Sequence, residues 1–284
     1  SGSNATGISS VRLQVSSNGG TTWDDNATFT APASGGTAYT VTASPALVSG
    51  TTYSVRALVT DLATNTVTSA LSTTNGRITV DTTAPTVGTL TLDTDNGSSS
   101  SDGIVGTLTP AFTLATASDA SYTGTSAPTA AIASVVVQVS TNDGGSWTTK
   151  GTSSSTSSPY AITLSGLTSQ TTYKIQALVT DVAGNTSTAA LTTTTNALVT
   201  VDTTAPTAGT VTMTTNDPGS DGIVNTLTPS FELAVSGTSD GSYTGSGSNA
   251  TGISSVRLQV SSNGGTTWDD NATFTAPDRK STRL

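Results

Sequence analysis

The sequence predicts an all-β protein built from tandem β-sandwich repeats of about 121 residues. Thr supplies 64 of the 284 residues, whereas the strong helix formers Lys and Glu supply three and one. Because β-branched side chains pack well on a pleated surface, this composition favours strands. Apolar and polar residues also alternate over short segments bounded by Gly, Pro, Asn and Asp, which is the pattern of half-buried strands. The same segments recur along the chain, which indicates a repeat architecture.

The composition excludes most catalytic chemistry. The chain has no His and no Cys, so it holds no Ser-His-Asp or Cys-His machinery, no disulfide, and no zinc, haem or iron–sulfur site built on those ligands. The net charge is −9, which argues against nucleic acid and anionic lipid as partners. No apolar run is long enough for membrane insertion. We therefore predict a chain that is not an enzyme.

Self-comparison of the sequence predicts the domain organisation. SNATGISSVRLQVSSNGGTTWDDNATFTAP recurs unchanged at two places, and VDTTAPT at 80–86 returns at 201–207. TTYSVRALVTDLATN likewise matches the later TTYKIQALVTDVAGN. The predicted units are the C-terminal two-thirds of a repeat (1–80), a complete repeat (81–201), the N-terminal two-thirds of a following repeat (202–277) and a non-native tail (278–284).

The tail DRKSTRL breaks the repeat abruptly and carries three of the nine basic residues. It resembles the in-frame translation of a short-read sequencing adapter, and we exclude it from reasoning about the fold. The chain shows no signal peptide and does not begin with Met, so both ends are expected to be cut from a longer protein.

Within the complete repeat, alternating segments separated by turn signals predict seven strands. They are 87–93, 111–116, 133–140, 146–150, 160–164, 172–180 and 190–201. A Gly-rich hairpin is expected at Asn142-Asp143-Gly144-Gly145, and Trp147 just after it is expected to fill the core. Leu167 precedes Tyr173 by six residues, which fits a tyrosine corner. About seven short strands with such a corner describe a β-sandwich.

The segment LTSQTTYKIQALVTDVAGNTS (167–187), the DTTAP joint and the loop DTDNGSSSSDGI (93–104) resemble the immunoglobulin-like or fibronectin-type-III-like tandem repeats of giant secreted RTX-type bacterial surface adhesins. The resemblance covers residues 1–277. It implies a non-catalytic stalk on the bacterial cell surface, outside the cell, that projects a terminal binding domain. It also implies neighbouring repeats of the same chain as partners, a host or biofilm surface ligand bound through other domains, and joints stiffened by Ca²⁺.

Asp and Asn residues suggest two candidate calcium sites, one at each end of the complete repeat. Successive loops of a Greek-key sandwich gather at alternate ends, so four residues are expected to meet at the N-terminal end: Asp81, Asp119, Asp181 and Asn185. The opposite end is expected to gather Asp93, Asp95, Asn96 and Asp102 near Asp202, and the third copy has Asn216, Asp217 and Asp221 at the corresponding places. Short oxygen-bearing side chains on turns suit Ca²⁺. The same residues also cap turns without any metal, so both interpretations stay open.

Three further interpretations compete with the stalk. Ser140, Asn142, Gly144, Ser146 and Trp147 resemble the Asp-box hairpin of sialidase-like propellers, but the motif recurs once per repeat with Asn in place of Asp, so we reject that enzyme. A glycan- or protein-binding module would use the loops 117–131 and 151–159, with Tyr122, Tyr243 and Tyr160 as exposed aromatics. The chain is alternatively a spacer in a secreted polysaccharide-degrading enzyme.

Overall fold

The computed structural model describes most of the chain. The described residues are 7–30, 38–73, 76–97, 99–119, 131–215, 217, 219, 221–234, 240 and 253–274. The predicted tail, Asn216, Tyr122 and Tyr243 lie outside them. Apart from one short 3₁₀ turn, η2 (Thr195–Ala197), the regular structure named in the described residues is β-strand. The all-β prediction is therefore confirmed.

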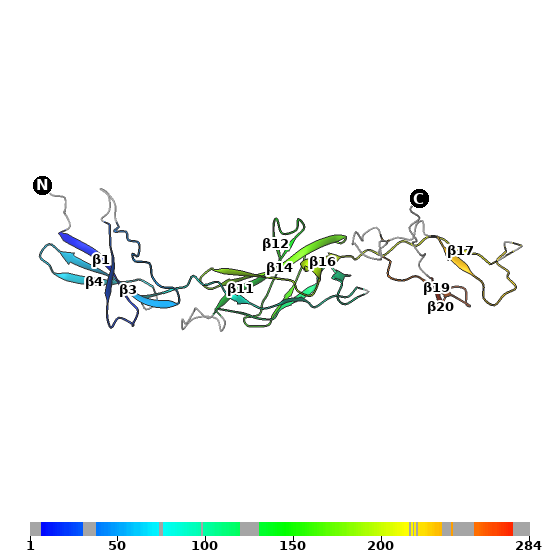
Figure 1. Ribbon diagram of the computed structural model, residues 1–284, viewed down its shortest axis with the longest axis horizontal. Helices are drawn as coiled ribbons and strands as arrows, with labels where there is room; N and C mark the ends of the chain where they lie inside the picture. Colours follow the sequence, from blue (N-terminus) through cyan, green and yellow to red (C-terminus); the bar gives the residue numbers. More distant parts are fainter. Residues whose placement is uncertain are drawn as a thin grey trace, which may run out of the picture.

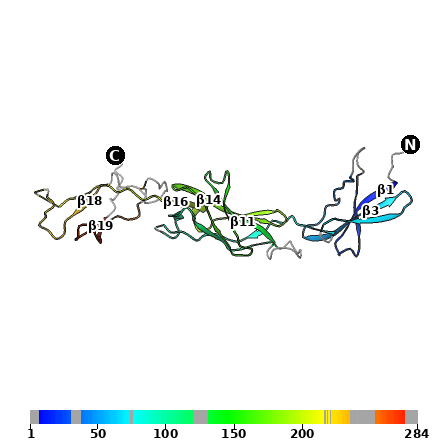
Figure 2. The ribbon, with the colours of Figure 1, turned by 180° about the vertical axis from the view of Figure 1, so that it is seen from behind.

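The strands fall into three successive groups that follow one another along an elongated molecule (Figure 1). The first group holds β1 (Ile8–Ser16), β2 (Asp24–Thr28), β3 (Thr51–Asp61), β4 (Thr66–Ala70) and β5 (Arg77–Val80). The third holds β17 (Val211–Met213), β18 (Phe231–Leu233), β19 (Arg257–Val260) and β20 (Asp269–Thr273). Seen from behind, the same order runs from the N-terminal sheet to β18 and β19 at the far end (Figure 2).

The middle group holds the remaining strands. They are β6 (Thr86–Val87), β7 (Leu90–Leu92), β8 (Ile104–Val105), β9 (Ala111–Leu114), β10 (Ala117–Ser118), β11 (Ile132–Ser140), β12 (Thr148–Thr152), β13 (Tyr160–Thr163), β14 (Thr171–Asp181), β15 (Thr186–Ala190) and β16 (Leu198–Val201).

Two sheets enclose the core of the middle group. One has the order β12-β11-β14-β16-β8, with β15 also paired to β14, and the other has the order β13-β9-β7. Their facing side chains form one buried cluster that includes Phe112, Tyr160, Ile175 and Val179. Alternate residues of β14 are buried and partly exposed, as the period of a strand requires. The apolar residues that alternate along the strands therefore form the core between the two sheets.

Several details differ from the sequence prediction. Of the strand expected over 190–201, only 198–201 form a strand of their own, β16, because η2 turns the chain before it with Asn196 at φ 58°. Residue 190 is the end of β15, which was not predicted. The short strand β8 pairs in parallel with β16 and was not predicted, since two residues are too few to show alternation. Trp147 is partly exposed beside Gly144, whose added Cβ would lie 3.4 Å from the indole. The prediction that Trp147 fills the core was therefore wrong.

The tyrosine corner is confirmed. The Tyr173 hydroxyl accepts a hydrogen bond from the backbone N–H of Thr168 at 3.0 Å. In the first group, the Tyr53 hydroxyl accepts from the N–H of Val48 at 3.2 Å. Both phenol rings are buried at the start of a long central strand, so each fixes the loop that leads into it.

The corner and the core tyrosine allow a matched comparison. Tyr173→Phe removes the acceptor of the Thr168 N–H, and we expect a loss of about 1 kcal/mol in unfolding free energy. Tyr160→Phe removes a buried hydroxyl that has no hydrogen-bond partner among the described residues. The second change should therefore leave stability unchanged or raise it. Guanidinium unfolding of both variants, followed by circular dichroism, measures the difference. Equal losses would show that the corner bond does not stabilise the fold.

Candidate acidic site at the first joint

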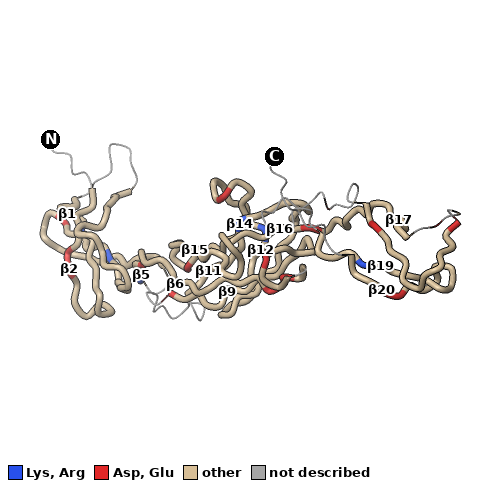
Figure 3. The backbone as a smooth tube through the Cα atoms, turned by 45° about the vertical axis from the view of Figure 1, so that its right-hand side comes forward, with Lys and Arg blue, Asp and Glu red and all other residues tan. Residues whose placement is uncertain are grey.

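The structure brings together three carboxylates where the first group of strands meets the middle group. Asp81 directly follows β5, Asp119 directly follows β10, and Asp181 ends β14. One carboxylate oxygen from each lies within 4.8 Å of the other two. Asp181 is 1% exposed, Asp119 is 9% exposed and Asp81 is partly buried. Acidic residues are visible between β5 and β6 and at the turn near β15 (Figure 3).

The local sequence TDVAGN shapes one side of this cluster. Asp181 Oδ1 accepts the backbone N–H groups of Ala183 at 2.9 Å and Asn185 at 2.8 Å. Its Oδ2 accepts the Asn185 side-chain amide at 2.9 Å. Gly184 provides the positive φ, 95°, that the turn needs. Asp181 therefore closes the turn after β14 and still faces the other two carboxylates.

The first group repeats this turn without the glycine. Asp61 Oδ1 accepts the Asn65 N–H and its Oδ2 accepts the Asn65 side-chain amide, both at 2.8 Å. Thr64 takes the left-handed conformation there, with φ 72°. The same hydrogen bonds therefore form without Gly, at the cost of an unfavourable φ for a β-branched residue.

The linker that enters the middle group is fastened at two points. The Asn185 side-chain amide donates to the main-chain oxygen of Asp81 at 3.3 Å, and the Ser187 hydroxyl donates to the main-chain oxygen of Pro85 at 2.5 Å. Pro85 also fixes its own φ and biases Ala84 to an extended conformation. These hydrogen bonds therefore hold the linker against β15.

Charge crowding changes the ionisation of Asp81. The Thr83 N–H donates to Asp81 Oδ1 at 3.0 Å and lowers the pKa of this carboxyl. Burial and the neighbouring Asp119 and Asp181 carboxylates act in the opposite direction and prevail, so the pKa of Asp81 is raised. Asp81 Oδ2 is buried without a hydrogen-bond partner among the described residues. This oxygen is available to a cation or a proton.

The acids expected at the opposite end do not form such a group among the described residues. They accept hydrogen bonds from backbone N–H groups close by in the chain or, for Asp93, from a hydroxyl on the neighbouring strand β9. Thr113 donates to Asp93, Gly103 to Asp95, Gly106 to Asn96, Ile104 to Asp102 and Thr204 to Asp202. In the third group, Gly222 donates to Asp217 and Ile223 to Asp221. These contacts are the turn-capping alternative.

Asp95 differs from its neighbours in one respect. Burial raises its pKa, although the Gly103 N–H acts against this, and Asp102 adds repulsion. Its Oδ1 is buried without a hydrogen-bond partner among the described residues. Two acids nevertheless make a poorer cation site than three, and Asp102 is exposed.

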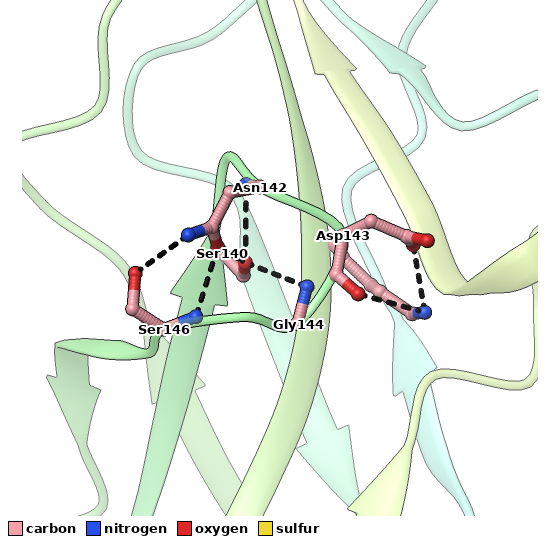
Figure 4. Close-up of polar contacts among 6 residues, drawn as sticks. Ser140, Asn142, Asp143, Gly144 and Ser146 are labelled. Carbon is pink, nitrogen blue, oxygen red and sulfur yellow. Dashed lines mark hydrogen bonds and ion pairs between the residues drawn. The ribbon is translucent and has the colours of Figure 1, made fainter.

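The β11–β12 hairpin satisfies its own polar groups (Figure 4). The Ser140 hydroxyl accepts the Gly144 N–H at 2.9 Å, and Asn142 Oδ1 accepts the Ser146 N–H at 2.9 Å. The Asn142 amide donates to the Ser146 hydroxyl at 3.0 Å, and Lys174 pairs with Asp143 at 2.8 Å. The motif that resembles an Asp box therefore builds a turn.

Three residues of the molecule have roles that the sequence did not reveal. Ser187 gives no signal in a chain so rich in Ser, yet it fastens the linker. Arg56 stacks on Trp23, 3.9 Å from the ring centroid, which explains why that Trp lies on the sheet surface. Tyr160, expected to be available to a glycan, is 2% exposed and belongs to the core.

Comparison with known proteins gives no relative: no protein-family model matches the chain, and no curated protein is similar to it. In the described part of the chain, no helix is long and apolar enough to cross a membrane.

The raised pKa of Asp81 predicts a pH effect in metal-free protein. A folded-state pKa above the unfolded value of about 3.9 makes ionisation destabilising, so this destabilisation is absent at low pH and grows as pH rises through the folded pKa. We expect Asp81→Asn to gain stability relative to the unmodified chain as pH rises from about 4. Unfolding of both proteins in EDTA across this range measures the difference. A stability difference independent of pH would contradict the assignment.

Proposed function

We propose that the chain is a non-catalytic structural repeat that forms the stalk of a secreted bacterial surface adhesin, with immunoglobulin-like sandwich modules whose joints are stiffened by calcium. The observation that carries the proposal is the cluster of Asp81, Asp119 and Asp181 at a joint. A stalk keeps a terminal domain at a distance from the cell, so its function depends on the stiffness of the joints between modules.

The elongated succession of strand groups supports this function (Figure 1). Every hydrogen-bonded sheet named in the described residues stays within one group. The stability of such an array is close to a sum of unit and joint terms. The linker contacts of Asn185 and Ser187 already restrict the joint without a metal.

The donor set of the cluster fits Ca²⁺. Ca²⁺ takes carboxylate, carbonyl and amide oxygens in flexible geometry, and extracellular modules bind it at about 10⁻⁴–10⁻³ M. Asp81, Asp119 and Asp181 would supply carboxylate oxygens, including the unpartnered Oδ2 of Asp81. The ion would remove the repulsion that raises the pKa of Asp81. Binding would also link the strand end of the first group to two loops of the middle group.

Thermal unfolding of the chain in EDTA and in about 0.1 to 10 mM Ca²⁺, with Mg²⁺ as control, tests this proposal. We expect the melting temperature to rise with Ca²⁺ and not with Mg²⁺, with a gain of about 1.4 to 2.7 kcal/mol per site at the highest concentration. A melting temperature that does not respond to Ca²⁺ would reduce the chain to a Pro-linked spacer without metal.

Asp119→Asn provides a control, because its effect on stability should be opposite in EDTA and in Ca²⁺. In EDTA this variant should be at least as stable as the unmodified chain, because one of three crowded charges is gone. In Ca²⁺ it should be the less stable of the two, because a ligand is lost. Asp143→Asn, at the exposed hairpin far from the joint, should respond to Ca²⁺ as the unmodified chain does. Loss of the calcium response in both variants would point to nonspecific charge screening.

A further inference from the structure

The first group of strands carries a basic surface, although the chain is acidic overall. Three of its residues are Arg12, Arg56 and Arg77. Arg77 in β5 pairs directly with Ser54 in β3, and residues two apart in a strand share a face, so Arg56 and Arg77 lie on the same face of the sheet. Tyr53, whose ring is buried, points to the other, apolar face. A second sheet over the apolar face would therefore leave both arginines uncovered.

The side chains of both arginines reach the turn between β1 and β2 (residues 17–23). Arg56 stacks on Trp23, with its guanidinium carbon 3.9 Å from the ring centroid. Trp23 packs against Gly20, where an added Cβ would lie 3.4 Å from the indole. At the neighbouring Gly19, an added Cβ would lie 3.6 Å from Nη2 of Arg77. Two guanidinium groups therefore lie beside one turn.

These two positive charges have no acidic partner among the described residues. Arg56 donates through Nε to the neutral side chain of Gln14 at 2.8 Å. Arg77 is exposed. Arg12 differs from both, because it pairs with Asp25 at 2.5 Å. The charges of Arg56 and Arg77 are thus available to an anion from outside.

In the middle group the corresponding turn contains its own carboxylate. Asp143 occupies the place of Gly19, and Lys174 pairs with it at 2.8 Å (Figure 4). Asp143 has φ 56° and Gly19 has φ 73°, so the backbone conformation at this position is similar in the two turns. An acidic side chain at this position is therefore compatible with the turn and meets a cation.

The cations are also arranged differently in the two groups. Ser54 takes the place of Lys174 in the first group. In the middle group, Gln176 and Leu198 occupy the places of Arg56 and Arg77. The middle turn therefore has one cation and one acid, whereas the first turn has two cations and lacks the acid.

We propose that the β1–β2 turn of the first group binds the carboxylate groups of an acidic polysaccharide, a polymer of uronic acids, through Arg56 and Arg77. The carboxylate of the ligand would lie beside Gly19, where the middle group carries the carboxylate of Asp143. Guanidinium groups bind carboxylates through paired, charge-assisted hydrogen bonds. Gly19 has no side chain to occupy this place.

The other side chains of the turn favour a sugar over a protein as the partner. No large apolar side chain is exposed within the described turn, residues 17–23. A protein interface normally has an apolar core, which this surface does not provide. The exposed side chains are instead those of Ser17, Asn18, Thr21 and Thr22. Hydroxyl and amide groups can exchange hydrogen bonds with the hydroxyls of a sugar ring.

Calorimetric titration of the whole chain with an oligogalacturonate tests this proposal, with a neutral galactose oligomer as control. EDTA in the buffer keeps Ca²⁺ from bridging the ligand to the acidic cluster, so the outcome is independent of the proposed calcium site. We expect the oligogalacturonate to bind, less tightly as salt is added, and the neutral oligomer not to bind. Absence of oligogalacturonate binding at low salt would overturn the proposal. Tighter binding of poly-glutamate would overturn the choice of a polysaccharide.

Gly19→Asp supplies within the chain the carboxylate that the ligand is proposed to supply. It should weaken binding of the oligogalacturonate by about tenfold or more, although it removes neither cation. The matched control is Gly19→Asn, which has a similar shape without the charge and also tolerates a positive φ. The Asn variant should bind nearly as well as the unmodified chain. Equal binding by the Asp and Asn variants would overturn the proposed position of the carboxylate.

Arg56→Gln and Arg77→Leu introduce the residues that the middle group has at these places, so both variants should fold. Gln138 and Gln176 already form a hydrogen bond of 2.9 Å there. Each variant should weaken oligogalacturonate binding by about tenfold. Lys150→Gln, which removes one positive charge from the middle group, should bind as the unmodified chain does. An equal loss in all three variants would show general charge attraction and overturn the site.

Discussion

The structure depends on one constraint: the apolar face of a sheet is fully buried only where a second sheet covers it. The chain is rich in Thr and poor in large apolar residues, so a single layer buries little surface. In the middle group two layers meet and the facing residues are nearly all inaccessible, with Phe112, Leu114 and Val179 fully buried. The equivalent positions of the first and third groups are partly exposed, although the sequences of their strands are similar. Stability here therefore follows from completeness of the layers more than from the composition of any one strand.

At the joint between the first and middle groups, single residues take part in more than one interaction. Asp181 closes a turn through three hydrogen bonds and also contributes a carboxylate to the acidic cluster. Asn185 completes that turn and binds the linker at Asp81. The geometry of the turn and the position of the linker are thus coupled, and a change in either displaces the charges that raise the pKa of Asp81.

Sequence reasoning predicted the strands with long alternation, the tyrosine corner and the meeting of Asp81, Asp119 and Asp181. These features depend on local periodicity and on the order of the loops in a sandwich, and both can be read from the sequence. It missed β15, the two-residue strand β10, and β8, whose two residues pair in parallel across a long sequence separation. It also misplaced Trp147 and Tyr160, because a large aromatic near a turn has no local signal for inside or outside. The two candidate cation sites looked alike in composition, and only the structure separates the clustered acids from those that cap turns.

The path of the chain through the middle group decides how that group would carry tension. The chain enters through the linker held by Asn185 and Ser187, and it leaves through β16, which is hydrogen-bonded to β14 on one side and β8 on the other. The long strands run roughly along the molecule (Figure 1), and ladder hydrogen bonds lie across the strands. Pulling on the two ends therefore loads the β16 bonds in shear, so that they resist together rather than opening one after another. Force applied along the molecule would therefore reach the middle group as shear on the hydrogen bonds of β16.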